Sequence, residues 1–309
     1  MKKTMKTLAV IAAVLLSLGL IVCVGAMATT ENGFRDAVSW FTTPLFVSWD
    51  NNTHRLRVSV PEEYGEPASY DFTAAGAIRE IVIETVSPRI RLVPTAGIDR
   101  MRVHYTERYD GQFIVAEDGG TLRITQDAVI GSVGLDFQSL TEEIIIEYPS
   151  GTALDALTIE SVNGSVDIGA LTAKTVRLGG TNGGVHLSEL TANTVVYASV
   201  NGSLTGTLTC DSLTANTTNG GFTLALDARS AEFAHVNADI KLTLAGSPGE
   251  YALDYSAVNT DLEFNGRDLD AGQYTFTADG RPIVGVANAA RVLRISGTNG
   301  GVSLETVRP

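Results

Sequence analysis

A short corner motif recurs in one frame through the second half of the chain, and it limits the possible folds more than any other feature. The segments SVNGSVDI, GTNGGVHL and SVNGSLTG begin at Ser161, Gly180 and Ser199, so the same Asn-Gly step returns at equal intervals along the chain. A fixed period of about 20 residues is typical of one structural unit that is stacked many times. The repeat therefore predicts an array of similar coils.

The frame extends well beyond these three segments. With the asparagine as reference, the intervals between successive corners in the numbering are 19, 19, 18, 18, 22 and then 40. Gly280 falls near the middle of the last interval, and Ser87 falls in the same frame near the start of the register, which runs from residue 78 to the end. The reference positions are Asn163, Asn182, Asn201, Asn219, Asn237, Asn259 and Asn299.

Apolar residues stand at fixed offsets from the corners: four residues before, and three and five residues after, with Gly206 after Asn201 as a departure. Alternate residues of a strand point to the same face, so this spacing predicts two short strands per coil, each with one buried face, and excludes a helix. At three of the corners the inward residues are Ile159, Val166 and Ile168; Phe233, Ile240 and Leu242; and Ile295, Val302 and Leu304.

We predict an all-β fold, a parallel, single-handed β-solenoid (β-helix) with coils of about 19 residues, preceded by one N-terminal transmembrane helix. Each coil must stack on the one before it, which accounts for the constant spacing. Asn-Gly readily takes the positive φ of a sharp turn, and stacked asparagine side chains can hydrogen-bond along a ladder. An antiparallel meander or a sandwich remains as the alternative, because Asn-Gly between alternating strands is also a hairpin signal.

The units are less regular between Tyr70 and Pro149. The segment QFIVAEDGGTLRIT predicts a hairpin around Gly119-Gly120, which either projects from the first coils or caps them. At the other end, Arg308 and Pro309 are expected to blunt an exposed strand edge.

The N-terminus carries Lys2, Lys3 and Lys6, followed by an uncharged run from Leu8 to Ala28. About 20 apolar residues span a bilayer, and lysines prefer the cytoplasmic side, so the remaining chain is expected outside the cytoplasm. The domains are then a basic tip (1–7), an anchor or signal segment (8–28), a juxtamembrane linker and cap (29–74) and the solenoid ectodomain (75–309). Two alternatives also export the chain: cleavage after the AMA triplet that ends at Ala28, or lipidation at a box that ends at Cys23.

Both tryptophans, Trp40 and Trp49, fall in the linker. They suit a membrane interface, where one end of the ring is apolar and the other is wet, or they cover the open end of the solenoid.

The charge balance and the cysteines exclude several classes of protein. A net charge of -13 without a basic stripe disfavours nucleic acid and anionic lipid surfaces. Cys23 and Cys210 are the only cysteines, and Cys23 lies in the apolar run, so the ectodomain closes no internal disulfide and has no paired-cysteine zinc site.

No residue stands out as catalytic, cofactor-binding or metal-binding. Asp167, Asp239 and Asp261 recur near the corners, and in a stack that follows the sequence Asp239 and Asp261 align about 5 Å apart, which suits at most a weak cation site. Solvated turn aspartates are the commoner case. His186 is expected to point outward, and His54, His104 and His235 stand in no motif.

The lysine-rich span, the aromatic linker, IREIVIETVSPRIRLVP, the Gly-Gly hairpin, EEIIIEYPSGTALDALTIESVNGSVDI and the serial coils together resemble the bacterial putative adhesin family, domain of unknown function 4097. The resemblance covers residues 75 to 309 and is most specific from Glu142 to Ile168. It implies a β-helical ectodomain on a membrane anchor, a link to envelope-stress sensing in some members, and no agreed catalytic residues.

We therefore expect a membrane-anchored, non-catalytic surface module of the cell envelope that serves in adhesion, ligand binding or envelope-state sensing. Its partners would be an envelope polymer or protein, and the membrane through the N-terminal segment. The alternative is an extracytoplasmic β-helix enzyme that acts on polysaccharide. Such enzymes carry long loops around a cleft, and coils as short as these leave little room for them.

Overall fold

The computed structural model describes residues 46–50, 55–59, 68–107, 111–126, 142–285 and 289–307. These residues are almost entirely β-strand, and the one helix among them is the 3₁₀ turn Pro248–Glu250. An antiparallel hairpin, β1 (Phe46–Asp50) with β2 (Arg55–Ser59), forms a sheet of its own. All other strands belong to one compact unit, residues 65–127 with 141–309, and to one mixed sheet.

The first strands of this unit are β3 (Ala68–Thr73), β4 (Glu80–Thr85), β5 (Arg89–Thr95), β6 (Arg102–Glu107), β7 (Phe113–Asp118), β8 (Thr121–Gln126), β9 (Glu143–Pro149), β10 (Ala153–Ser161) and β11 (Val166–Ile168). The later strands are β12 (Leu171–Asn182), β13 (Val185–Asn201), β14 (Ser203–Leu244), β15 (Tyr251–Phe264), β16 (Arg267–Leu269), β17 (Gly272–Phe276), β18 (Pro282–Val284) and β19 (Arg291–Thr306).

The predicted N-terminal span, Leu8 to Ala28, lies outside the described residues, as do Trp40, His54 and Cys23. Within the described part of the chain, no helix has the length and hydropathy needed to cross a bilayer.

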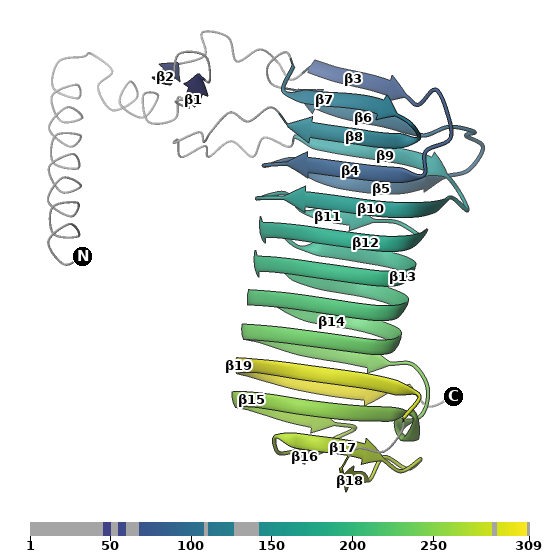
Figure 1. Ribbon diagram of the computed structural model, residues 1–309, viewed down its shortest axis with the longest axis vertical. Coiled ribbons are helices and arrows are strands. Elements are labelled where there is room, and N and C mark those ends of the chain that lie inside the picture. The colour runs from purple at the N-terminus through teal and green to yellow at the C-terminus, as the bar shows by residue number, and fades with distance from the viewer. Residues whose placement is uncertain are drawn as a thin grey trace, which may run out of the picture. The chain divides into compact units, whose positions relative to one another are not determined.

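The middle of the unit is a solenoid-like stack of parallel coils. Ile159 of β10 pairs with Leu178 of β12, and Leu178 pairs with Tyr197 of β13, one repeat further along the chain. The corner at Asn163 is not a hairpin, because β10 pairs with β4 and β12 whereas β11 pairs with β5 and β13. Successive coils therefore stack in parallel here, which rules out a meander through this corner (Figure 1).

The inward positions expected from the sequence form the core. Ile159, Ile168, Phe233 and Leu304 are each at most 1% exposed, and they belong to one continuous hydrophobic cluster that runs through the stack. Burial of each such side chain contributes about 1.5–3 kcal/mol, so each coil is stable only when its neighbours cover both of its edges.

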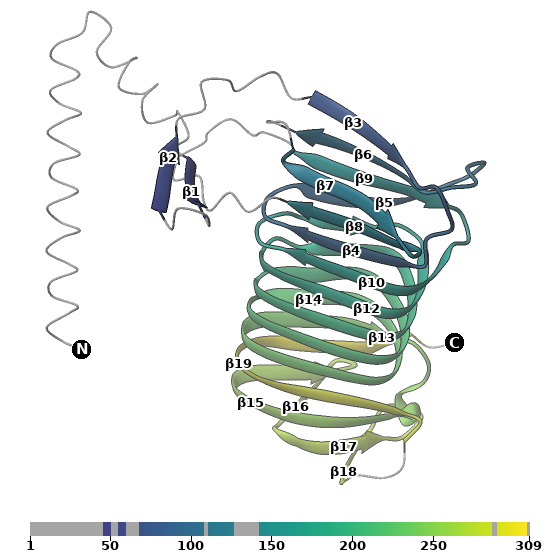
Figure 2. The same ribbon diagram turned by 45° about the horizontal axis from the view of Figure 1, so that its top comes forward.

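The order of the coils differs from their order in the sequence at the C-terminal end. We expected the coil of Asn259 to stack on that of Asn237, and the chain to end at an exposed edge. Instead β19 pairs in parallel with β14 on one side and with β15 on the other, so the last coil lies between two earlier ones. Figures 1 and 2 show the yellow β19 inside the green stack. All three coils have the same inward pattern, so the sequence pattern could not distinguish these orders.

The N-terminal end repeats this arrangement. β4 lies between β8 and β10, and β5 lies between β9 and β11, all in parallel register. Ser87 therefore occupies a corner, as expected from its frame. The Gly119-Gly120 hairpin is also confirmed, since β7 and β8 pair in antiparallel register across it.

The assignment of Gly280 to a coil corner is wrong. Gly280 lies in an antiparallel hairpin in which Phe276 pairs with Pro282 and Thr275 with Ile283. Ile283 is 50% exposed, so it is not a core residue. The excursion between β15 and β19, which contains β16 to β18, thus adds hairpins instead of another coil.

The asparagines of the corners form a ladder of amide hydrogen bonds. Asn182 Nδ2 donates to Asn163 Oδ1 at 2.8 Å, and Asn201 Nδ2 donates to Asn182 Oδ1 at 2.7 Å. The ladder continues through Asn219, Asn237, Asn299 and Asn259 in that order.

A glycine follows most of these asparagines. It is required mainly because the backbones of neighbouring coils approach each other closely there, and less because of its φ angle. A Cβ at Gly202 would collide with the backbone oxygen of Gly183, and one at Gly220 would collide with that of Gly202. Neither residue has a positive φ. The coils thus stack backbone on backbone at this corner, which leaves no room for a side chain.

Candidate functional site

A shallow groove runs along the stack just before the asparagine ladder, and we name it the corner groove. Its floor consists of outward residues three positions before each corner, and its rim consists of those one position before. The floor residues are Glu84, Glu160, Gly179, Ala198, Asn216, Ala234 and Ser296. The rim residues are Val86, Val162, Thr181, Val200, Thr218, Val236 and Thr298.

The rim is an exposed row of β-branched side chains. Val162, Val200 and Val236 are 42%, 44% and 45% exposed, and threonines stand between them. β-Branched side chains have few rotamers, so the row is a stiff and regular ledge with one side chain per strand, about 4.8 Å apart.

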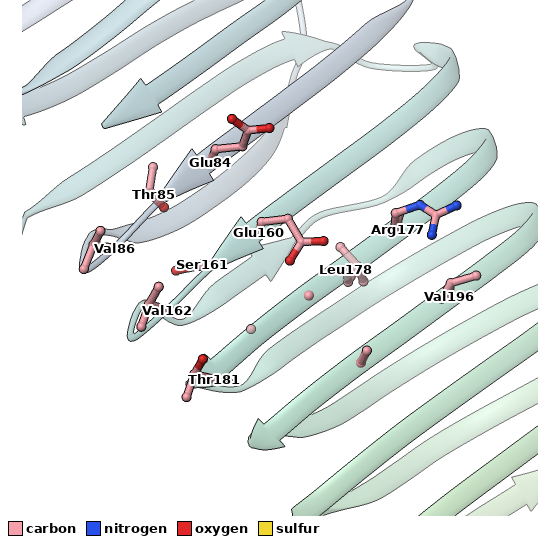
Figure 3. Close-up of a pocket in the computed structure, with 13 residues that line it drawn as sticks. Glu84, Thr85, Val86, Glu160, Ser161, Val162, Arg177, Leu178, Thr181 and Val196 are labelled. Carbon is pink, nitrogen blue, oxygen red and sulfur yellow. The ribbon is translucent and has the colours of Figure 1, made fainter. Parts of the chain in front are cut away.

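The upper part of the groove is a hollow of about 450 Å³ (Figure 3). Glu84 of β4 and Glu160 of β10 are register neighbours, and Arg177 of β12 lies on the next strand. The Glu160 carboxylate lies over Gly179, where a Cβ would meet it first. The hollow therefore exists because the floor has a glycine where a side chain would fill the space. A carboxylate and a guanidinium line this hollow and are exposed to solvent.

The lower part is a second hollow of about 420 Å³, which shares Ala198 with the first. Its floor is nearly without charge, and its lining includes Asn216, Ser296 and the buried residues Thr217 and His235. Together the two hollows, which meet at Ala198, extend from β4 to β19 within the described residues.

A column of polar side chains lies beneath the groove, two positions before several of the corners. Ser161, Thr217 and His235 are 5%, 5% and 4% exposed. Gly164 N donates to Ser161 Oγ at 3.1 Å, and Thr217 Oγ1 donates to the Gly202 oxygen at 3.3 Å. The side chains of this inward column thus supply hydrogen-bond partners for backbone N–H and C=O groups at the tight corner.

Other members of the column lack a hydrogen-bond partner: Thr85 Oγ1, Ser199 Oγ and the ring of His235. Both ring nitrogens of His235 are buried without a hydrogen-bond partner, and burial lowers the pKa of the imidazole, with Asp239 opposing this effect. Its register partner in β19 is Gly297, and a Cβ there would collide with the ring. Sequence reasoning placed His235 in no motif; its frame, two residues before Asn237 like Ser161 and Thr217, was the available signal.

An acidic groove of about 930 Å³ lies after the corner, beside the excursion that follows β15. Asp239 and Asp261 both line it, but they are not adjacent as expected, because Gly301 of β19 pairs with Asp261 and lies between the two coils. Gly301 N donates to Asp239 Oδ1 at 2.9 Å. The charged side chains in this groove are Asp239, Lys241, Asp261, Glu263, Asp268 and Asp270, and all are exposed.

The other residues singled out in the sequence are dispersed. Asp167 pairs with Arg89 at 2.7 Å, and His186 is exposed and hydrogen-bonds to Thr205 Oγ1 at 3.1 Å. Within the described ranges, no group of three histidine, cysteine or acidic side chains is placed to hold a metal ion.

His104 and Cys210 were also singled out in the sequence, and the first contacts two carboxylates whereas the second is buried. His104 hydrogen-bonds to Asp71 and Glu147; burial lowers its pKa, but these two carboxylates outweigh burial and the net pKa is raised. Cys210 is buried, and burial raises its thiol pKa to about 12, so the thiolate nucleophile is scarce.

The carboxyl groups that line the two grooves are all solvent-exposed. An acid and a base divide their roles when one carboxyl group is buried and the other is solvated. Glu84 and Glu160 are both exposed, and so are the carboxylates of the acidic groove. The corner groove instead offers a long contact surface with amides, hydroxyls and a few charges.

Three solved structures illustrate what this chain resembles. A putative adhesin from Parabacteroides distasonis ATCC 8503 is 14% identical, with a TM-score of 0.41 and coverage of 79% of this chain and 98% of that chain. A putative lipid binding protein from the same strain is 13% identical, with a TM-score of 0.41 and coverage of 79% and 97%. A putative adhesin from Bacteroides fragilis NCTC 9343 is 14% identical, with a TM-score of 0.39 and coverage of 78% and 97%.

No curated protein matches this chain. The family model does: the model described as Toastrack DUF4097 matches residues 78–225, the stretch that contains β4 to β13 and the first half of β14. This confirms the family resemblance noted in the sequence: residues 78–225 match the Toastrack DUF4097 family.

Proposed function

We propose that the chain is a non-catalytic cell-envelope module whose corner groove binds an extended polymer. The observation that carries this is the continuity of the groove: the two hollows meet at Ala198, and the floor and rim repeat once per coil. A ligand with its own regular repeat can make the same contact at every strand, about 4.8 Å apart, and so gain affinity by multivalency.

The charge of the chain narrows the ligand class. A net charge of -13 repels anionic polymers at a distance, so the ligand is an uncharged or amino-bearing chain. Glu84 and Glu160 would face an amino group at the upper end of the groove, while the rim valines would contact apolar faces and the threonines would hydrogen-bond to hydroxyls or amides.

In the proposed arrangement the stack is a single-handed β-helix held outside the cytoplasm by a membrane-spanning N-terminal helix. The residues that support this are Lys2, Lys3 and Lys6, with the apolar run from Leu8 to Ala28 after them. Protease added to intact, wall-stripped cells should then digest the stack and leave a small membrane-bound N-terminal fragment. Full protection of the chain would contradict this topology.

The groove is tested by filling its hollow. In Gly179→Gln the new side chain displaces only the flexible Glu160 carboxylate among its nearest neighbours, so the fold should tolerate it. The full-length protein in detergent is mixed with purified cell-wall sacculi and sedimented. We expect at least tenfold weaker binding for Gly179→Gln and Ala198→Tyr than for the wild type.

Thr223→Tyr is the matched control, since Thr223 is exposed in β14 on the wall that follows the corner. Its binding should equal that of the wild type. If all three variants sedimented with the sacculi as well as the wild type does, the groove would not be the binding surface. Release of new reducing ends from the sacculi would favour the polysaccharide-acting enzyme, and Glu160→Gln and Asp268→Asn would then show which groove is responsible.

A further inference from the structure

The last coil of the chain, residues 291–306, lies between two coils that are consecutive in the sequence. We name it the guest coil. We name its two neighbours the host coils: one is residues 230–244 of β14, and the other is β15. Ile240 and Leu262 both pair with Val302, one from each side. The guest coil thus separates host coils that the sequence alone would have stacked together.

The two host coils are in register with each other across the guest coil. Phe233 and Tyr255 both pair with Ile295, and Leu242 and Phe264 both pair with Leu304. All four of these host side chains point into the core. If the guest coil left, the host coils would face each other with every inward residue opposite an inward residue and Asn237 opposite Asn259.

The connection between the host coils is long enough for either arrangement. Six residues, Ala245 to Glu250, join β14 to β15, whereas only Gly169 and Ala170 join β11 to β12. Six residues reach up to about 20 Å, while one strand spacing is about 4.8 Å. The linker therefore bridges the guest coil now and would also permit direct contact of the host coils.

We propose that this stack has a second folded state, in which β15 pairs directly with β14 and the guest coil is released. Direct pairing would replace two coil interfaces with one, so the released state loses a single interface and keeps a closed core. Release of the guest coil therefore costs much less free energy than removal of a coil whose two neighbours could not pair with each other. The guest coil is thereby a conformational switch built from the repeat itself.

Three sets of contacts hold the guest coil in place and set the equilibrium between the inserted and the released state. At its start, Arg291 donates to Asp227 of β14 and to Glu250 of the linker, with the latter contact at 3.3 Å. At its end, Thr306 N donates to Asn265 Oδ1 at 2.9 Å.

In the middle of the guest coil, the buried His235 ring fills the space beside Gly297. In the released state this ring would face Ala257 of β15, which has a methyl group where Gly297 has none. His235 therefore selects the guest coil over closure of the host coils. Substitution of Gly297 should reverse that preference.

Pairs of introduced cysteines distinguish the two states. Ala234 and Ser256 are both register partners of Ser296, one on each side, and thus lie two strand spacings apart, about 9.6 Å. A disulfide needs Cα atoms within about 7 Å. In full-length Cys23→Ser/Cys210→Ala protein, the pair Ala234→Cys/Ser296→Cys reports the inserted state and Ala234→Cys/Ser256→Cys reports the released state.

We expect the 234/296 pair to oxidise and the 234/256 pair to stay reduced when Gly297 is present. With Gly297→Val, the 234/256 pair should oxidise at least tenfold faster. Gly184→Val is the control, because a Cβ at Gly184 makes only ordinary contact and the guest coil is distant in the stack. No acceleration in Gly297→Val would overturn the proposal.

A truncation covers the case in which Gly297→Val fails to fold. Deleting residues 286–309 removes the guest coil altogether, and the remaining stack should close, unfold cooperatively and oxidise the 234/256 pair almost completely. A truncated chain that loses its cooperative transition, or keeps the 234/256 pair reduced, has no closed second state, and the proposal is then wrong.

Discussion

The imidazole of His235 in β14 occupies the space beside Gly297 of β19 where a side chain would otherwise lie. The two residues are far apart in the sequence, yet they are register partners on neighbouring parallel strands. This contact joins an unpartnered buried titratable group to the coil that comes last in the sequence.

The first prediction concerns the fit of these two residues. Gly297→Ala should destabilise the fold by about 1–3 kcal/mol, because its Cβ collides with the ring in a packed core. In a His235→Ala background the same change should cost at least about 1 kcal/mol less, since the two sites are in contact. Urea unfolding of the four proteins measures the coupling. Additive effects, or an equal loss in Gly184→Ala, would show that the contact is not specific.

The second prediction is the sign of the pH dependence from His235. Burial lowers its pKa in the fold, so between the ordinary histidine pKa of about 6.5 and the lower folded value the unfolded chain binds more protons. The contribution of His235 to the free energy of unfolding is complete above the ordinary histidine pKa. It is lost as the pH falls from that value toward the lower folded pKa. The wild type should therefore lose more stability than His235→Gln on going from pH 7.5 to 5.5.

His104 gives a control of opposite sign. Its net pKa is raised by Asp71 and Glu147, so it adds stability as the pH falls, and His104→Gln should lose that gain. Urea midpoints at each pH distinguish the two histidines. A His235→Gln profile parallel to that of the wild type would contradict the assignment.

The third prediction concerns the asparagine ladder. Asn201 takes part in two amide hydrogen bonds, of 2.7 and 2.9 Å, whereas Asn163 accepts one of 2.8 Å at one end of the ladder. These amides are exposed, so each bond contributes at the low end of about 0.5–1.5 kcal/mol. Asn201→Ala should lower the free energy of unfolding by about 1 kcal/mol and Asn163→Ala by about half as much. Equal losses would mean that the ladder does not stabilise the stack.

The fourth prediction compares the two faces of one strand pair. Ile168 is 1% exposed and pairs with Leu92 and Leu187, so Ile168→Asp buries an unpaired carboxylate at a cost of several kcal/mol. His186 is exposed one residue before Leu187, and His186→Ala should change stability by less than about 0.5 kcal/mol. Thermal unfolding should therefore separate the variants clearly; similar shifts would reverse the assigned faces.

Much of the local structure could be predicted because strand geometry allows few choices. An alternating pattern places every second residue on one face, and this sufficed for Ile159, Phe233 and Leu304. The hairpin at Gly119-Gly120 followed from the same local rules, as did the hydrogen bonding of the corner asparagines. The glycine after the asparagine was also recognised, although its reason is backbone contact between coils.

The floor of the corner groove could not be predicted from any one coil. Gly179 opens a hollow only because Glu160 and Ala198 lie on the strands on either side of it. Likewise, the unpartnered state of His235 depends on Gly297, which local sequence does not place beside it. Such features belong to the stack, and their lining comes from residues many positions apart.

What the sequence by itself determined is the period, the inward face of each coil and the corner ladder, because these depend on backbone geometry within one repeat. The tertiary structure alone decided the order of the coils at both ends. Identical inward patterns make the coils interchangeable, and the loop-closure entropy that favours Asn237 beside Asn259 over Asn299 is only about 0.9 kcal/mol. Contacts outside the repeat pattern act against that small difference: Arg291 with Asp227 and Glu250, and Gly297 with His235.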